Sequence, residues 1–390
     1  MNPRIFVLTM CTFAFGSAAF IFAGLLEKMA ADLGVSTAVA GQLQTAYVLT
    51  SALLGPVAAW ALGRLDRKYV VIAGLVLSIA LHLACSWAPN FQTLLVFRAF
   101  AGLAGAMSGP AASVAAASLV PPERRGSALA MVSGGMTLAF VVGIPIGSVV
   151  GSIFDWRATF LVAAVLSAIA LIGVVVFLPR VPAPPKRQSG QRLEIAGIWP
   201  LYLTSFLTFA ANMTLNLYIA PIVRVGTGIT GAGVAVFQAM IGFGAAAGLW
   251  LGGRAADRNA GKAWVLQAIA GQAAAMSLHL SATHHLLPPG LPSEALVALA
   301  IFVAAASLFS ISPVTQSRLI QMTGGAPVAL ALNGSVFAMG QALGATLGGV
   351  ALASYGVPAI PAAALMMSAV AFSTLVFVFP RATRPSEQVG

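Results

Sequence analysis

The chain has 390 residues, of which 59% are hydrophobic and only 7% are charged, and its formal net charge is +11. Soluble domains carry about 25% charged residues, so this composition excludes a water-soluble enzyme and indicates a surface that faces lipid. The apolar stretches run for about twenty residues without period-two alternation, which is typical of membrane-spanning helices.

The apolar stretches predict twelve transmembrane helices. The first six lie near residues 5–26, 41–62, 70–87, 92–117, 128–152 and 158–178. The second six lie near residues 198–222, 233–252, 263–286, 294–316, 328–352 and 359–379. We therefore predict an all-α membrane protein with a six-helix bundle over 1–179, a Pro-rich cytoplasmic linker over 180–197, and a second six-helix bundle with a short tail over 198–390.

The basic residues gather on one side of this predicted topology. The side that holds both termini carries Arg4, Arg64, Arg67, Lys68, Arg124, Arg125, Arg180, Lys186, Arg187, Arg192, Arg254, Arg258, Lys262, Arg318, Arg381 and Arg384. The other side carries Lys28, Arg157 and Arg224. This bias predicts a multi-pass protein of the cell (inner) membrane with both termini in the cytoplasm. The positive charge is thereby explained without a nucleic-acid partner.

Two sets of residues recur at nearly the same offset. The run GRLDRK at 63–68 returns as GRAADR at 253–258, which is 190 positions later. Gly143, Gly147 and Gly151 return 197 positions later, and the second set is Gly340, Gly344 and Gly348. The recurrence predicts two homologous halves, an arrangement found in secondary transporters, with a substrate site between them near the membrane midplane.

Together these features resemble the major facilitator superfamily over nearly the whole chain. The resemblance rests on the loops GRLDRK at 63–68 and GRAADR at 253–258, which we call the first and second GR loop. It rests also on the FRAF segment around Arg98, on GIPIG at 143–147 and on DWRATF at 155–160. It is strongest to the twelve-span drug:proton antiporter family and, within it, to the branch of sugar, nucleoside and drug exporters. It implies export of a small organic molecule by alternating access, coupled to proton antiport. We expect no metal or cofactor, a monomer, and only lipid, substrate and protons as partners.

The GR loops are candidates for gating. Asp66 lies among basic residues on a short turn with Gly63 and Arg67, where a carboxylate can bridge neighbouring helix ends. A contact made in only one conformation would bias the equilibrium between inward- and outward-facing states. The alternative is a solvated charge cluster that only fixes topology. Asp257 and Arg258 are the copy of this motif in the second half, and both interpretations stay open there.

The fifth span carries a candidate packing seam. Gly143, Gly147 and Gly151 share one helical face, and Pro145 weakens the local hydrogen-bond ladder and permits a bend. The eleventh span has Ala342 where Pro145 would fall. We expect a tight seam that limits leakage, with generic helix packing as the alternative.

Uncharged polar residues give the candidate substrate site. Asn212 and Asn216 share a face of the seventh span, and Asn333, Phe337 and Gln341 share a face of the eleventh. Apolar walls are expected from Tyr47, Phe15, Phe209 and Met213. Each amide could instead make only interhelical hydrogen bonds.

Arg98 is the one basic residue predicted inside a span. The resemblance implies a role in coupling or in tying the fourth span to the first. It could also bind an anionic substrate, or reach toward the membrane surface.

The acidic residues depart from the family pattern. Ala19 stands where related exporters carry a first-span carboxylate, and all nine acids fall in loops or at span ends. Glu27 or Asp32 would then be the titratable group that couples transport to protons, unless the driving force is something other than a proton gradient. Without a midplane carboxylate we expect neutral sugar-, nucleoside- or drug-like substrates first, anions second and permanent cations last. The alternatives are a proton-independent facilitator or exchanger for an organic anion, and a transport-inactive receptor or assembly protein.

Overall fold

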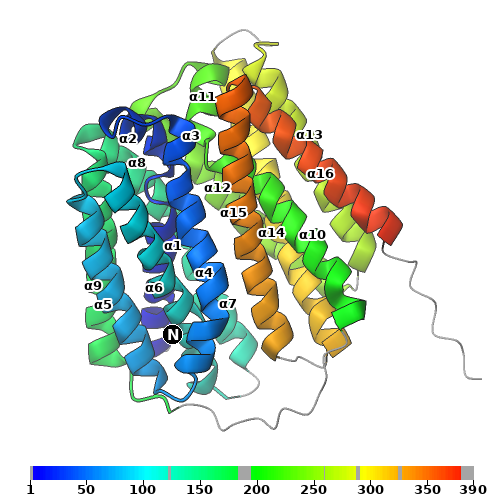
Figure 1. The fold of residues 1–390 in the computed structure, drawn as a ribbon. Coiled ribbons are helices and arrows are strands. Elements are labelled where there is room, and N and C mark those ends of the chain that lie inside the picture. Colours follow the sequence, from blue (N-terminus) through cyan, green and yellow to red (C-terminus); the bar gives the residue numbers. More distant parts are fainter. Residues whose placement is uncertain are drawn as a thin grey trace, which may run out of the picture.

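The computed structural model describes residues 3–121, 124–182, 195–258, 260–286, 290–323 and 327–378. All regular structure in these ranges is helical, and the long helices stand side by side (Figure 1). The amino terminus lies at the lower end in that view, so we call this end the lower face and the opposite end the upper face. The predicted all-α membrane fold is confirmed.

The first half contains six rods, several of which are interrupted. They are α1 (Pro3–Phe20) with η1 (Ala23–Leu25) and α2 (Leu26–Asp32); α3 (Thr37–Ala40) with α4 (Gln42–Ala61); α5 (Arg67–Ser86); α6 (Phe91–Ser118); α7 (Arg125–Leu138) with η3 (Ala139–Gly143) and α8 (Ile144–Ile153); and α9 (Trp156–Phe177).

The second half repeats this order. Its rods are α10 (Ile195–Asn216) with α11 (Ile219–Thr227); η4 (Gly231–Gly233) with α12 (Val234–Asp257); α13 (Gly261–Thr283); α14 (Leu291–Thr323); α15 (Pro327–Tyr355); and α16 (Ala359–Val378). Helices α10 and α11 meet at an angle of 55°.

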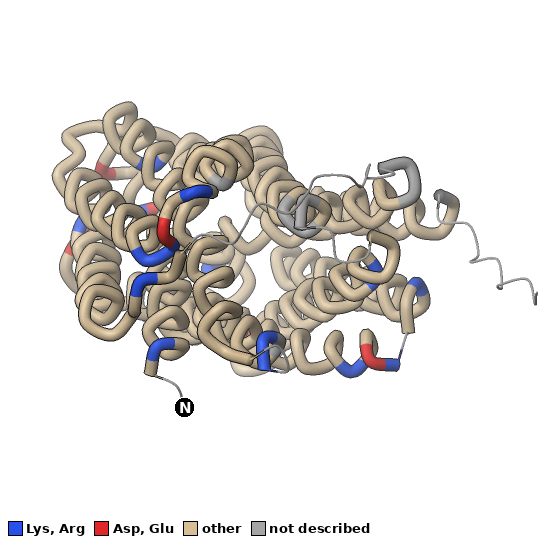
Figure 2. The backbone as a smooth tube through the Cα atoms, turned by 90° about the horizontal axis from the view of Figure 1, so that it is seen from below, with Lys and Arg blue, Asp and Glu red and all other residues tan. Residues whose placement is uncertain are grey.

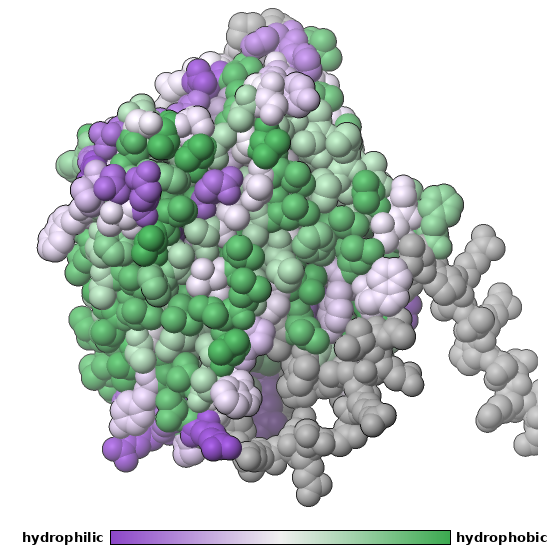
Figure 3. Space-filling model, viewed as in Figure 1, coloured by the Kyte–Doolittle hydropathy of each residue, from purple (hydrophilic) through white to green (hydrophobic). Residues whose placement is uncertain are grey.

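Within the described residues, nine helices are long and apolar enough to cross a membrane, and the bent pair α10–α11 makes ten. Helices α4 and α13 do not reach the same hydropathy, since each carries two glutamines. Counting these two gives the predicted twelve, and their membrane crossing stays a prediction. On the face seen in Figure 3, apolar residues cover most of the middle of the molecule, and hydrophilic residues gather toward both ends.

The glycine stripes build matching seams in the two halves. A Cβ atom added to Gly147 would lie 2.2 Å from the backbone oxygen of Ile21 in the first rod. A Cβ atom added to Gly344 would lie 2.2 Å from the backbone oxygen of Ala210 in the seventh. Only glycine permits these backbones to approach so closely. The repeat read from the sequence therefore appears in the packing.

The most extensive contacts between the two halves lie along two pairs of helices. Helix α4 packs against α15, and the η3–α8 segment packs against α12. The predicted linker falls largely on residues 183–194, which lie outside the described residues. The division into two bundles at this linker stays a prediction.

Candidate substrate cavity

A cavity of about 150 Å³ lies between the two halves. It is lined by Phe20 and Ala23 from the first rod, by Met136, Phe140 and Ile144 from the fifth, and by Phe209, Asn212, Met213, Asn216, Leu217, Gln238, Ile241, Leu308, Phe309 and Gln341 from the second half. None of these fifteen side chains is charged. The site is therefore largely apolar, with a few amides that can direct hydrogen bonds.

The amides all come from the second half. Asn216 donates from Nδ2 to Oδ1 of Asn212, and Asn212 donates from Nδ2 to the backbone oxygen of Ala304 at 3.4 Å. Gln238 accepts at Oε1 a 2.5 Å hydrogen bond from the hydroxyl of Ser148, which lies on α8 of the first half. Hydrogen bonds within the protein thus hold the two asparagines and the oxygen of Gln238.

Aromatic rings form the walls. Phe140 of η3 lies 5.4 Å from Phe20 and 5.6 Å from Phe309, measured between ring centroids. Phe209 stacks on Phe337 with centroids 4.4 Å apart. Rings in this arrangement can contact the faces and edges of a flat group.

The structure brings part of the predicted substrate site together. Asn212, Asn216 and Gln341 line the cavity, as do the expected wall residues Phe209 and Met213. Phe337 stands behind the ring of Phe209 and does not line the cavity itself.

Other expected residues lie away from this cavity, namely Asn333, Phe15, Tyr47 and Arg98. Sequence reasoning also missed Gln238 and the aromatic rings at 20, 140 and 309. A signal for Gln238 was present, because it is the one amide within the apolar run of the eighth span.

Arg98 is fully buried inside the first half. Its guanidinium donates to the backbone oxygens of Ala18 at 3.1 Å and Ala19 at 2.9 Å, and to Oε1 of Gln44 at 3.3 Å. It also lies over two aromatic rings, at 4.6 Å from Phe22 and 4.4 Å from Tyr47. The side chain points into the bundle and does not reach toward the membrane surface. In this conformation it ties the fourth rod to the first.

Contacts between the halves close the upper end. Thr45 and Thr346 place their hydroxyl oxygens 3.3 Å apart. Glu27 pairs with Arg224 at 2.7 Å, so this ion pair also spans the two halves. At Gly41 an added Cβ atom would lie 2.0 Å from the hydroxyl of the buried Tyr218. These contacts hold the two halves together at the upper face.

Comparison with known proteins identifies the family. The model of the Major Facilitator Superfamily matches residues 8–324. The chain belongs to this superfamily. It is 31% identical to the uncharacterized MFS-type transporter YfhI of Bacillus subtilis, over 90% of this chain and 87% of that protein.

Two other relatives of this transporter have names that state an activity. The chain is 30% identical to the purine ribonucleoside efflux pump NepI of Salmonella typhimurium, over 90% of this chain and 87% of the pump. It is 31% identical to the chloramphenicol resistance protein of Streptomyces lividans, over 84% of this chain and 83% of that protein.

Solved structures share the fold of the transporter. The nucleoside transporter NupG matches with a TM-score of 0.73 at 12% identity, over 96% of this chain and 97% of that one. A bacterial homologue of the lysosomal transporter Spinster, in an inward-facing and unoccupied conformation, matches with a TM-score of 0.69 at 19% identity, over 96% and 94%.

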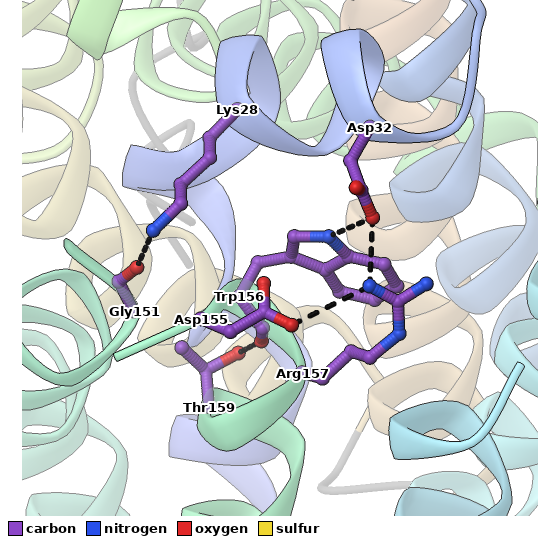
Figure 4. Close-up of polar contacts among 7 residues, drawn as sticks. All are labelled: Lys28, Asp32, Gly151, Asp155, Trp156, Arg157 and Thr159. Carbon is purple, nitrogen blue, oxygen red and sulfur yellow. Dashed lines mark hydrogen bonds and ion pairs between the residues drawn. The ribbon is translucent and has the colours of Figure 1, made fainter. Parts of the chain in front are cut away.

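Asp32 anchors the upper end of the first half of the transporter (Figure 4). Its carboxylate accepts a hydrogen bond from Nε1 of Trp156 at 2.9 Å and pairs with Arg157 at 2.7 Å. Nearby, Nζ of Lys28 donates to the backbone oxygen of Gly151 at 2.7 Å. These contacts hold α2 on α8 and α9, and the partners of Asp32 all belong to its own half.

Asp66 directly precedes α5 in the loop that follows α4. Figure 2 shows the molecule from below, and Lys and Arg residues are frequent in that view. Asp66 caps α5 by accepting from the backbone nitrogen of Lys68 at 2.8 Å, and it accepts from the backbone nitrogen of Val181 at 3.1 Å. Arg67 donates to the backbone oxygen of Gly63 at 2.8 Å. In this conformation the first GR loop thus joins helix ends within one half.

The second GR loop ends α12. Asp257 is the last residue of that helix, and Arg258 follows it directly. Arg254 stacks its guanidinium 3.6 Å from the ring centroid of Trp250. The copy therefore differs from the first loop, in which the acid begins a helix.

A π-helical turn, η3, lies directly before α8 and ends two residues before Pro145, while the bend predicted at Pro145 stays a prediction. Proline lacks the backbone N–H that would bond to the oxygen of Val141, so the ladder widens at this point. The turn presses Val141 against Gly242 of α12, where an added Cβ atom would lie 2.4 Å from the backbone nitrogen of Val141. The motif therefore shapes both the seam to α1 and the contact with the second half.

Proposed function

We propose that this transporter exports a small uncharged organic molecule by alternating access. The observation that carries the proposal is the cavity between the halves, whose lining has amides and aromatic rings and no charged side chain. Membership of the superfamily leaves the substrate class and the direction of transport open, and the cavity is the basis for proposing both.

The lining disfavours charged substrates on energetic grounds. A permanent cation in this cavity would have no carboxylate partner, and an unpaired charge in such a site costs several kcal/mol. An anion would need Arg98, whose guanidinium is already bonded to Ala18, Ala19 and Gln44. Neutral molecules ask only for hydrogen bonds that the amides can supply.

The shape and chemistry fit a planar ring that carries donors and acceptors. Phe20, Phe140 and Phe309 can contact the faces and edges of such a ring, while the asparagines and Gln341 address its polar edge. Nucleosides and chloramphenicol meet this description, in agreement with the names of two relatives.

The conformation supports the direction. The upper face is closed by contacts between the halves, and the bias of basic residues predicts that the lower face is cytoplasmic. This arrangement agrees with the inward-facing state in which an exporter would load substrate from the cytoplasm.

Proton antiport is the proposed driving force. Of the two candidate acids, Glu27 is the better placed, because its partner Arg224 belongs to the other half. The pair of Glu27 with Arg224 joins the two halves at the upper face, whereas Asp32 acts within one half.

Uptake into inside-out proteoliposomes tests the proposal. Adenosine and chloramphenicol are the neutral probes. They are compared with one anion, adenosine monophosphate, and one permanent cation, tetraphenylphosphonium, each with and without a pH gradient. We expect gradient-driven uptake of at least one neutral probe and none of the charged ones. Robust uptake of tetraphenylphosphonium would overturn the proposed substrate class, and gradient-independent uptake would overturn proton antiport.

A further inference from the structure

Gln238 is a buried amide at the roof of the cavity. It lies one turn into α12, its side chain is 1% exposed, and it is among the lining residues. Only its oxygen is engaged, by the hydroxyl of Ser148. Its Nε2 has no hydrogen-bond partner within the described part of the chain. A buried amide nitrogen normally has a hydrogen-bond partner, so this nitrogen is an unsatisfied donor that could bind an acceptor on a ligand.

The position of Gln238 is fixed by three elements. An added Cβ atom at Gly24 of η1 would lie 2.2 Å from Oγ of Ser148 and 2.7 Å from Nε2 of Gln238. The backbone of the first rod therefore packs directly on this pair. With Oε1 held by Ser148 on α8, the amide cannot rotate freely, and the donor is oriented before any ligand arrives.

We propose that Gln238 donates a hydrogen bond from Nε2 to an acceptor on the ring system of the substrate, a carbonyl oxygen or an aromatic ring nitrogen. The inference deepens the proposed function and rests on it. Phe140 and Phe309 lie on the same cavity, so the acceptor would belong to a flat ring held against these side chains. Gln238 is thus a specificity-determining residue contributed by the eighth rod.

A purely structural glutamine would behave differently. If its only function were to join the halves, its bond to Ser148 would suffice, and loss of Nε2 would affect all ligands equally. A donor to the substrate instead discriminates between two ligands that differ by one acceptor atom, since a site built around a hydrogen bond rejects the analogue that lacks it.

The test combines a protein change with an atomic change in the ligand. Binding of adenosine and of its 1-deaza, 3-deaza and 7-deaza analogues, each lacking one ring nitrogen, is measured on purified wild-type transporter and on Gln238→Met. Methionine keeps the side-chain length and removes the amide. Ser148→Ala and Gln341→Met are matched controls, and thermal unfolding verifies that each variant is folded.

We expect one deaza analogue to bind the wild type about tenfold to one hundredfold more weakly than adenosine does. Gln238→Met should weaken adenosine by a similar factor and abolish the difference between the two ligands. Ser148→Ala should reduce the difference partly, and Gln341→Met should preserve it. For a substrate whose acceptor is a carbonyl, chloramphenicol and its thioamide analogue replace the adenosine pair, because the thioamide stays uncharged and its sulfur is a much weaker acceptor than the carbonyl oxygen.

The outcomes separate the two proposals. Binding by the wild type of neither adenosine nor chloramphenicol would overturn the proposed substrate class, and with it this inference. Tight binding of either probe, with an unchanged discrimination in a folded Gln238→Met variant, would overturn the role of Gln238 alone.

Discussion

The two halves of the transporter share their packing and differ in their chemistry. Gly147 and Gly344 make equivalent close approaches to the backbones of Ile21 and Ala210. Yet every amide that lines the cavity belongs to the second half, and the first half offers only apolar side chains there. The first half instead places its strongest polar group, Arg98, inside its own bundle. The repeated glycines preserve how helices pack, while the residues facing the cavity are free to diverge.

The largest effect is expected where the halves are alike. Gly147→Leu should prevent recovery of folded protein, because the new side chain meets the backbone oxygen of Ile21, which cannot move aside. Overpacking of this kind costs about 1–3 kcal/mol or more. Gly344→Leu should be as severe. The measurement is the yield of monodisperse protein in detergent and its thermal unfolding.

Gly151→Leu is the matched control for this seam. Its added Cβ atom would first meet the side-chain tips of Leu25 and Thr159, which can adjust. We therefore expect a milder loss than at Gly147. Equal tolerance at the two positions would reduce the seam to generic packing.

The next effect sharpens the difference between the halves. Asn212→Leu should weaken binding of a neutral substrate by at least about tenfold, because it removes an amide from the cavity and leaves Asn216 without its partner. Arg98→Leu should leave that affinity within about twofold and lower thermal stability, since its three hydrogen bonds are all internal to the first half. Binding isotherms and unfolding curves of both variants test the contrast.

The reverse pattern would contradict this assignment of roles. If Arg98→Leu weakened the binding of a neutral ligand as much as Asn212→Leu does, while its unfolding temperature stayed that of the wild type, the arginine would belong to the substrate site.

The same contrast explains what sequence could predict. Spans, repeat and glycine seams follow from hydropathy and spacing, which report properties of each helix and its direct neighbours. Asn212 and Asn216 could be found because they share a helical face in an apolar span. The orientation of the Arg98 side chain into the bundle could not be predicted, since it depends on where Ala18 and Gln44 lie in space. The role of the apolar rings at 140 and 309 likewise depends on how two distant rods cross.

A smaller effect is expected at the lower face. Asp66→Asn keeps an oxygen that can accept from the backbone nitrogens of Lys68 and Val181, so the fold should persist. It removes the charge that would bind across the halves when the lower face closes. A charge-assisted contact contributes about 1.5–3 kcal/mol, so the equilibrium should shift roughly tenfold or more toward the state that is closed above.

Cross-linking measures this shift. Thr45→Cys with Thr346→Cys, in a background without Cys11 and Cys85, should form a disulfide only when the upper face is closed, because the two hydroxyls are 3.3 Å apart there. Asp66→Asn should raise the rate of cross-linking and reduce transport. Asp257→Asn, at the end of α12, is the matched variant, with a weaker effect. Unchanged transport and cross-linking in Asp66→Asn, at equal expression, would remove the gating role.

The smallest effect, of opposite sign, is expected at the upper face. Glu27 and Arg224 form the ion pair that spans the halves, but their side chains are 36% and 49% exposed. Water and salt screen such a pair, which contributes at most about 1 kcal/mol. Glu27→Gln should therefore lower the rate of Thr45–Thr346 cross-linking by less than about fivefold. High salt should reproduce this decrease in the wild type and have little effect on the variant. Asp32→Asn should leave cross-linking unchanged, since both of its partners lie in its own half. If Asp32→Asn lowered the rate of cross-linking as much as Glu27→Gln does, closure would depend on the upper rim as a whole. The distinction between the ion pair that spans the halves and the one that anchors a single half would then be lost.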